Sequence, residues 1–258
     1  MLDGLVAGAL DDAARRRETR PLASVEREAL SLAPALDALS ALRRGATVKV
    51  IAEVKRASPS RGALASIPDP ALLAQQYALG GASAISVLTE ERRFGGSLAD
   101  LDAVRAAVSI PLLRKDFIAE PYQVFEARAA GADLVLLIVA ALDNATLHAL
   151  HALIIELGMT PLVETHDADE VRRAVDLGAS LIGVNARDLS TFELDRDLFG
   201  RLAPSIPEGT VRIAESAVSR VADVEHYRRA GADVVLIGEA LVTGGDPVAA
   251  LNEFLAVS

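Results

Sequence analysis

From Val48 onward, short apolar runs alternate with longer segments in which apolar residues recur at helical spacing. The runs predict strands buried on both faces, and the longer segments predict amphipathic helices. The eight predicted strands are Val48–Val54, Ser83–Thr89, Ile110–Lys115, Asp133–Val139, Thr160–Glu164, Leu181–Asn185, Val211–Glu215 and Asp233–Gly238. The predicted helices are Pro70–Leu79, Leu98–Ala107, Pro121–Ala130, Ala145–Leu157, Ala168–Leu177, Arg196–Leu202, Val221–Ala230 and Pro247–Val257. This alternation predicts parallel βαβ units.

An internal repeat indicates how the units are arranged. Gly81, Gly131, Gly178 and Gly231, each followed by Ala and then Ser or Asp, stand between a predicted helix and the next strand. Each glycine suits a helix C-terminal cap, where a left-handed backbone is needed. They recur about every 50 residues, with two βα units per period, which favours a closed (β/α)₈ barrel (TIM barrel) over an open sheet.

Residues 1–47 precede the first strand and read as a helical extension. Leu2, Leu5, Val6 and Leu10 have helical spacing, and further helices are predicted over Val25–Leu32 and over Pro34–Leu42, which starts at a proline. These helices are too short to form a core of their own. We therefore expect a single domain over residues 1–258, in which the extension (1–47) packs on the barrel (48–258).

Composition excludes several classes of protein. The formal charge of −10 and the 3% aromatic content argue against a nucleic-acid surface. No uninterrupted apolar run of about 20 residues predicts a transmembrane span. The absence of cysteine excludes disulfides, thiolate catalysis and cysteine-ligated metals. We expect a cytoplasmic protein that acts on a small molecule.

Candidate chemistry lies at the predicted strand ends, where the working residues of such barrels come from. The first, third, fifth and seventh strands end at Glu53, Lys115, Glu164 and Glu215. Alternate strands supply one layer of side chains, so these four should form a top layer, with Lys55 and Arg187 around it. A structural ion-pair network is the alternative to a catalytic layer. We favour the catalytic interpretation because solvation alone does not explain charged residues at the ends of four alternate strands.

Carboxylates and lysines held together in a dry pocket can be tuned for proton transfer. Lys115 is the candidate general acid and Glu164 the candidate general base, and this chemistry requires neither a metal nor a cofactor. The four histidines lie on predicted helices or before a helix cap, and we expect them to be exposed or capping: His148, His151, His166 and His226.

Two loops suggest binding functions. The segments after the seventh and eighth strands, Glu215–Ser219 and Ile237–Ala240, lie where such barrels commonly bind phosphate, and Gly238 permits close backbone approach. A tight structural turn explains Gly238 equally well. The loop Arg92–Ser97 contains two glycines that suggest mobility, with Phe94 able to cover an aromatic substrate; an ordinary βα loop is the alternative.

Taken together, these pieces resemble the indole-3-glycerol-phosphate synthase family in family order across nearly the whole chain, and the helical extension is also a family feature. The matching segments are Ile51–Ser60, Ser86–Glu90, Phe94–Ser97, Leu113–Phe117, Pro161–Glu164, Ile182–Leu189, Ile213–Ser216 and Ile237–Glu239.

The resemblance implies closure of 1-(2-carboxyphenylamino)-1-deoxyribulose 5-phosphate to indole-3-glycerol phosphate, with loss of CO₂ and water, in tryptophan biosynthesis. It implies that Lys115 is the general acid and that Glu164 accepts and donates protons. It also implies that Glu53 and Lys55 bind and orient the substrate and share in proton transfer. It further implies that Asn185, Arg187 and Glu215 shape and polarise the pocket. Substrate-binding positions implied by the match are Ser58, Phe94, Phe117, Leu189, Ser216, Ala217, Gly238 and Glu239.

One position departs from the family, whose usual Glu-Ser-Gly reads Glu215-Ser216-Ala217. Glycine would tolerate a positive φ, so alanine is unstrained only if the turn keeps φ negative. We expect a negative φ, and a strained or shifted loop is the alternative.

Two other functions are alternatives to this one. Phosphoribosylanthranilate isomerase is a related barrel enzyme, but it uses a cysteine base that this chain lacks. A non-catalytic barrel that binds a sugar phosphate is disfavoured because every matching charged residue is present. We expect a monomer.

Overall fold

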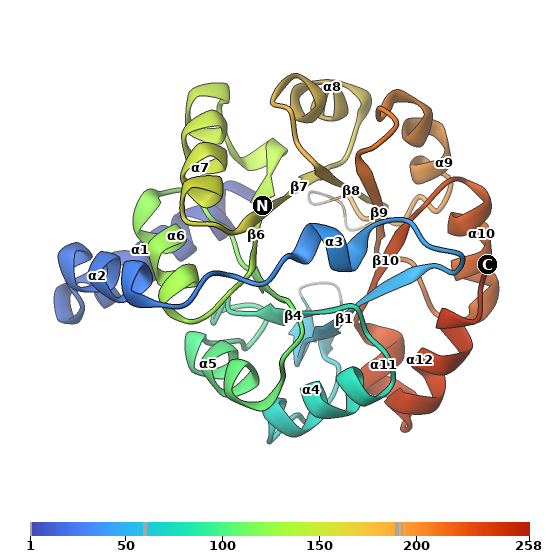
Figure 1. The fold of residues 1–258 in the computed structure, drawn as a ribbon, viewed down its shortest axis with the longest axis horizontal. Coiled ribbons are helices and arrows are strands. Elements are labelled where there is room, and N and C mark those ends of the chain that lie inside the picture. Colours follow the sequence, from blue (N-terminus) through green and yellow to red (C-terminus); the bar gives the residue numbers. More distant parts are fainter. Residues whose placement is uncertain (1, 59–60, 189–190, 192) are drawn as a thin grey trace.

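The computed structural model describes residues 2–58, 61–188, 191 and 193–258. Eight parallel strands close into a barrel in the order β1-β10-β9-β8-β7-β6-β5-β4, surrounded by helices (Figure 1). The strands are β1 (Lys49–Val54), β4 (Ala84–Leu88), β5 (Leu112–Lys115), β6 (Leu134–Ile138), β7 (Thr160–Thr165), β8 (Leu181–Asn185), β9 (Val211–Glu215) and β10 (Val234–Ile237). The predicted (β/α)₈ fold is confirmed. A small hairpin, β2 (Ala57–Ser58) and β3 (Gly62–Ala63), follows β1.

The outer helices match the predicted ones to within a few residues. They are α4 (Pro70–Leu79), α5 (Leu98–Ala107), α6 (Pro121–Ala129), α7 (Asn144–Glu156), α8 (Ala168–Asp176), α9 (Leu198–Leu202), α10 (Val221–Arg229) and α12 (Pro247–Leu255). Two single-turn 3₁₀ helices, Val139–Ala141 and Ala203–Ser205, and the short α11 (Glu239–Thr243) were not predicted. Helix α9 begins later than expected, because the Asp195 carboxylate accepts the Asp197 N–H and forms a turn first.

The N-terminal residues form α1 (Leu2–Thr19), α2 (Leu22–Ser31) and α3 (Ala38–Leu42). The predicted start of the third helix at Pro34 is wrong: the Asp37 carboxylate accepts the Ser40 N–H at 2.9 Å and caps the helix there. Helix α2 packs against α6, and α3 crosses one end of the barrel (Figure 1). Leu42 is fully buried there, among the apolar side chains of the barrel interior.

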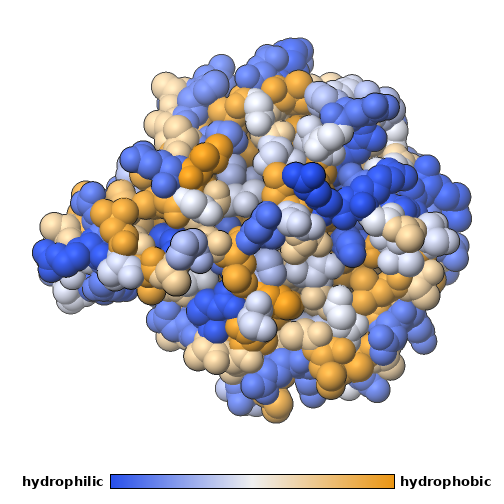
Figure 2. Space-filling view, viewed as in Figure 1, coloured by the Kyte–Doolittle hydropathy of each residue, from blue (hydrophilic) through white to orange (hydrophobic). Residues whose placement is uncertain are grey.

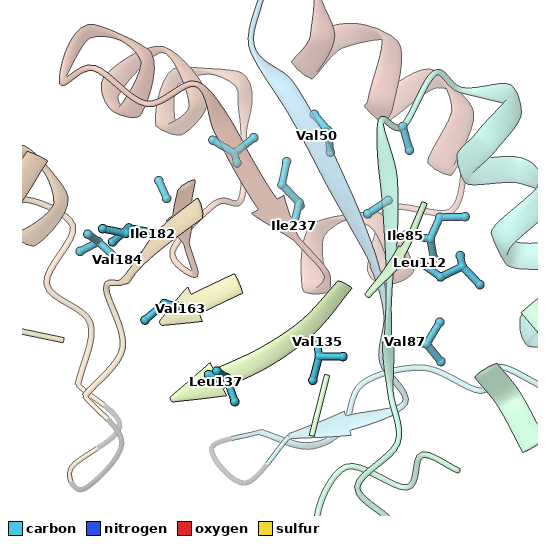
Figure 3. Packing of buried hydrophobic residues seen from close by; sticks show 14 of the residues in the cluster. Val50, Ile85, Val87, Leu112, Val135, Leu137, Val163, Ile182, Val184 and Ile237 are labelled. Carbon is cyan, nitrogen blue, oxygen red and sulfur yellow. The ribbon is translucent and has the colours of Figure 1, made fainter. Parts of the chain in front are cut away.

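Side-chain alternation along the strands creates two apolar layers. Outward-facing residues such as Val50, Val135 and Ile182 pack between the strands and the helices (Figure 3). Inward-facing residues such as Ile51 and Leu162 fill the barrel. Because side chains on one face recur every second residue, the positions two beyond these inner residues also face the barrel axis. The strand-end charges therefore point inward.

The four repeated glycines have the left-handed conformation that the sequence predicted. Their φ angles are 91°, 80°, 78° and 100° at Gly81, Gly131, Gly178 and Gly231. Each ends a helix and returns the chain to the next strand. On the face crossed by α3, polar and apolar side chains are interspersed (Figure 2). Among the described helices, none combines the length and the apolar character needed to cross a bilayer.

Candidate active site

A cavity of about 380 Å³ lies at the ends of the strands that carry the charged residues. The structure brings nearly all the residues named from the sequence to its wall: Glu53, Lys55, Ser58, Phe94, Lys115, Phe117, Glu164, Asn185, Arg187, Glu215, Ser216, Ala217, Gly238 and Glu239. Leu189, the remaining candidate, lies outside the described residues. The candidate residues, which come from different strand ends and loops, therefore meet at one cavity.

At the centre of the cavity floor, one lysine contacts two carboxylates. Lys115 Nζ lies 3.0 Å from Glu164 Oε2 and 2.5 Å from Glu215 Oε2. The carboxylate side chains are 2% and 1% exposed, and the lysine side chain is 15% exposed. Such burial costs too much for unpaired charges, so the three groups hold one another in place.

The shared environment separates the proton affinities of the two glutamates. Burial and the nearby Glu164 carboxylate raise the pKa of Glu215 to about 8, although Lys115 opposes the shift. Burial also works to raise the pKa of Glu164, but Lys115 and His166 outweigh it and hold that pKa well below its usual value. Burial alone would lower the pKa of Lys115, whereas Glu164, Glu215 and Glu53 together raise it. Glu164 is thus ionised and can accept a proton, and Lys115 is protonated and can donate one.

The second ion pair forms at the end of β1. Lys55 Nζ lies 2.7 Å from Glu53 Oε1, and the Glu53 side chain is 4% exposed. Gly238 directly follows β10, the strand that pairs with β1, and leaves room for this pair. A Cβ atom at position 238 would lie 2.6 Å from Glu53 Oε1 and 3.2 Å from Lys55 Nζ. Gly238 has φ −119°, so this position needs glycine for space rather than for a left-handed turn.

An amide links Glu164 to the neighbouring loop. Asn185 Nδ2 donates to Glu164 Oε1 at 3.1 Å, and Ser216 Oγ donates to Asn185 Oδ1 at 2.8 Å. The Arg187 N–H donates to the same Asn185 oxygen at 3.1 Å. Asn185 therefore fixes the orientation of Glu164 and connects it to the loop that follows β9.

That loop corrects the expectation for Ala217. Ser216 and Ala217 have φ angles of 70° and 58°, so both adopt the left-handed conformation and the expected negative φ is wrong. The turn folds the chain back sharply after Glu215. Within the described residues, the backbone N–H groups of Ala217 and Gly238 make no hydrogen bond, which leaves two donors at the cavity wall from the two loops expected to bind phosphate.

The opposite side of the cavity is aromatic. The rings of Phe94 and Phe117 lie with centroids 6.3 Å apart at 44°. The Glu90 carboxylate accepts the N–H groups of Arg92, Arg93 and Phe94 at 3.0, 2.7 and 2.9 Å, which anchors the loop.

The glycines of this loop, which predict mobility, also have a steric explanation. A Cβ atom at Gly96 would lie 2.0 Å from the Leu88 carbonyl oxygen, and Gly95 has φ 64°.

Sequence reasoning misjudged two histidines. His166, expected to be exposed or capping, has a side chain only 12% exposed, and its Nε2 lies 3.2 Å from Glu164 Oε1. His151, expected on an exposed face, is 8% exposed within α7, and burial lowers its pKa. His148 is exposed and the side chain of His226 is 43% exposed, in line with the expectation.

Sequence reasoning missed two further residues of the site, Gly183 and Glu90. A Cβ atom at Gly183 would lie 2.1 Å from Glu215 Oε1. A glycine inside a strand often marks such a close approach, so its position in the Leu181–Asn185 run was an available signal. Glu90 ends one of the segments that resemble the family, but its residue type alone gives no signal, because a carboxylate after a strand is as easily solvated as buried.

Comparisons with known proteins show the family of the chain. The profile of the family described as indole-3-glycerol phosphate synthase matches residues 2–254. The chain belongs to this family. An indole-3-glycerol phosphate synthase of Leifsonia xyli subsp. xyli is 71% identical over 257 residues, covering 100% of this chain and 98% of the relative. That of Mycolicibacterium smegmatis is 57% identical over 255 residues, covering 99% and 93%. The enzyme class predicted from the sequence, a carboxy-lyase of tryptophan biosynthesis, is confirmed.

Solved structures of lower identity share the barrel. A 3-hexulose-6-phosphate synthase aligns with a TM-score of 0.63 at 20% identity, covering 82% of this chain and 100% of its own. The N-acetylmannosamine-6-phosphate 2-epimerase from Clostridium perfringens aligns with a TM-score of 0.62 at 15% identity, covering 83% and 95%. At such identities the likeness concerns the fold alone.

Proposed function

We propose that the cavity closes the indole ring of 1-(2-carboxyphenylamino)-1-deoxyribulose 5-phosphate, with Lys115 as general acid and Glu164 as general base. The observation that carries this division of roles is the contact of Lys115 Nζ with both Glu164 and Glu215 in the buried layer. One group there holds a proton and another is deprotonated, within a few ångströms of each other, as general acid–base catalysis requires.

The first half of the reaction needs an acid. The ring carbon that bears the carboxylate attacks the ketone carbon, and the carbonyl oxygen becomes a hydroxyl by taking a proton from the Lys115 ammonium. Loss of CO₂ from the same ring carbon leaves its electron pair in the ring and restores aromaticity. The carboxylate leaves as neutral CO₂, so the whole reaction takes up one proton, which solvent returns to Lys115.

The second half needs a base. The new hydroxyl takes a proton from solvent and leaves as water while the adjacent methylene carbon loses a proton, which creates the double bond of the indole; the two proton transfers of this half cancel. In this proposal Glu164 accepts that proton, and its low pKa keeps it ionised beforehand. Glu53 and Lys55 orient the substrate, while Glu215 and Asn185 hold Lys115 and Glu164 in position.

The remaining contacts place the two ends of the substrate. The N–H groups of Ala217 and Gly238, with Ser216 and Glu239 beside them, would receive the phosphate. Phe94 and Phe117 would cover the aromatic ring, with Ser58 and Arg187 on the polar wall between. Leu189 is proposed as a further lining residue from the family match alone.

Lys115→Met and Glu164→Gln test the two roles. Product formation, followed by indole fluorescence in the presence of a chelator, should fall about 10²–10⁴-fold in each variant. Lys49→Met, at the far end of β1, and the exposed Glu156→Gln are the matched controls and should keep wild-type turnover. A folded variant at position 115 or 164 with near-normal turnover would remove that residue from its role. Binding without turnover by the wild-type protein would instead indicate the non-catalytic barrel.

Two further properties complete the proposal. We propose that the chain acts as a cytoplasmic monomer, which analytical ultracentrifugation and cell fractionation would test. We also propose that residues 1–258 fold as one domain, with 1–47 as an extension of the barrel over 48–258. Burial of Leu42 and the packing of α2 on α6 support this unity.

A further inference from the structure

His166 lies behind the proposed base. It follows the last residue of β7 and comes two positions after Glu164, so both side chains belong to the same face of the chain. Its Nε2 lies 3.2 Å from Glu164 Oε1, and its Nδ1 lies 3.0 Å from Glu170 Oε2. His166 does not line the substrate cavity. Its contacts are therefore with the base rather than with the substrate.

Both ring nitrogens of His166 face carboxylate oxygens. A neutral imidazole carries one N–H, so it can donate to only one of them and would turn a lone pair toward the other. An imidazolium ring carries a proton on both nitrogens: Nδ1 forms a hydrogen bond with Glu170, and Nε2 forms an ion pair with Glu164 at 3.2 Å that lacks hydrogen-bond geometry. Burial alone would lower the pKa of His166, but Glu164 and Glu170 outweigh it and raise that pKa to about 10. The ring is thus a cation at neutral pH.

Glu170 is itself held in position. It is the third residue of α8, and its Oε2 also accepts the backbone N–H of His166 at 2.8 Å. On the other side of Glu164, Lys115 contacts Oε2, and Glu215 lies beyond that lysine. The charged groups around the histidine and the base therefore alternate in sign, in the order Glu170, His166, Glu164 and Lys115, and Glu215, whose pKa is raised to about 8, lies next to the lysine.

We propose that His166 is a positioning residue for this reaction, an imidazolium that bridges Glu170 and Glu164 and keeps the Glu164 carboxylate oriented and ionised. The proposal rests on the proposed role of Glu164 as the proton acceptor. Without the cation at position 166, Glu164 would bind a proton more readily, and turnover would begin to fail at a higher pH.

The decisive measurement is the pH profile of kcat for His166→Gln, which keeps a polar side chain and removes the charge. An opposite charge at this distance typically shifts a carboxyl pKa by about 1 unit or more, so the acid limb of the profile should move upward by about that amount. KM should stay close to wild type, because the ring does not line the substrate cavity. His148→Gln, on the exposed face of α7, is the matched control and should leave the profile unchanged.

A spectroscopic measurement on the wild-type protein keeps the proposal testable if the variant does not fold. Ring nitrogen NMR shifts near pH 7.5, assigned by single His→Gln changes at positions 148, 151 and 226, should show His166 with both nitrogens protonated. A neutral ring there would overturn the proposal, as would a folded His166→Gln variant with an unshifted acid limb.

Glu164→Gln separates this outcome from a failure of the proposed function. If that variant keeps its turnover, the base assignment fails and the role of His166 fails with it. If it loses turnover while His166→Gln keeps the wild-type profile, only the inference about His166 is overturned.

Discussion

Gly183 and Glu215 lie so close that a methyl group on the glycine would be 2.1 Å from Glu215 Oε1. The two residues belong to neighbouring strands, β8 and β9, and both face the barrel axis. Glu215 in turn contacts Lys115 at 2.5 Å. Because Gly183 has no side chain, the Glu215 carboxylate can occupy the position from which it contacts Lys115, the proposed acid.

Gly183→Ala should displace Glu215 and lower turnover. A shift of about 1 Å in a catalytic constellation can cost about 10²-fold in rate, and we expect kcat/KM to fall by roughly that factor. The strand itself should persist, because alanine has no difficulty with an extended backbone. Gly200→Ala is the control: its added Cβ would meet only Ala230 Cβ, at an ordinary 3.5 Å. Equal kcat/KM values for the two variants would show that Glu215 tolerates the displacement.

Glu215→Gln should change how stability depends on pH. The pKa of Glu215 is raised to about 8 in the folded protein, above its usual value of 4.5. As the pH rises from about 4.5 to 8, the unfolded chain loses this proton and the folded protein keeps it, so the group's contribution to stability is progressively lost.

Glutamine does not titrate, so the variant escapes this loss. Relative to wild type, its free energy of unfolding should therefore increase by more than about 1 kcal/mol between pH 5 and pH 8, since one pKa unit corresponds to about 1.4 kcal/mol. Urea unfolding at a series of pH values measures this difference, and a difference that stays constant or shrinks would contradict the raised pKa.

Arg16→Met should destabilise the whole chain. Arg16 donates to both Glu126 oxygens, at 2.7 and 2.8 Å, and joins α1 to α6. Glu126 is 1% exposed and also lies 3.5 Å from the fully buried Arg114. Removing one partner of a buried charged hydrogen bond costs about 1–3 kcal/mol.

The free energy of unfolding should fall by that amount, and fluorescence and circular dichroism should still report one transition. Arg27→Met, on the exposed side of α2, should have little effect. Two separate transitions would show that the extension and the barrel are not one domain.

The sequence predicted the barrel and the layer of charges because both depend on periodicity. Inward and outward positions alternate strictly, so Glu53, Lys115, Glu164 and Glu215 had to face the same axis once their strands were placed. Contacts that depend on local backbone path could not be predicted in this way. His166 lies just beyond a strand, and whether it turns toward Glu164 or toward solvent is decided by Glu170 in the next helix.

The error at Ala217 has a similar physical origin. Alanine, like every residue with a Cβ atom, disfavours a positive φ, so the residue type favoured a negative φ. The observed φ of 58° is imposed by the turn that connects Glu215 to the rest of the loop. The packing of the turn therefore outweighs the conformational preference of alanine. No pattern in the sequence shows how strongly a turn constrains its residues.

Ala217→Gly tests the cost of that conformation. A left-handed backbone costs a non-glycine residue about 1–2 kcal/mol, and glycine loses about 0.5–1 kcal/mol more conformational entropy than alanine on folding. The net effect of Ala217→Gly should be stabilisation by about 0.5–1 kcal/mol. Ala214→Gly, three residues earlier in strand β9 where φ is not left-handed, is the matched control and should destabilise.

Substrate affinity should respond less than stability to the same change. The left-handed turn is already formed in the free protein, so the strain at Ala217 is present before and after the phosphate binds and largely cancels in the binding free energy. We expect Ala217→Gly to change the dissociation constant for inorganic phosphate or substrate by less than about tenfold, or roughly 1.4 kcal/mol. Calorimetric titration of both proteins measures it. A much larger gain for the glycine variant would show that alanine displaces the phosphate-binding N–H, and a loss of stability would show that the turn is not strained.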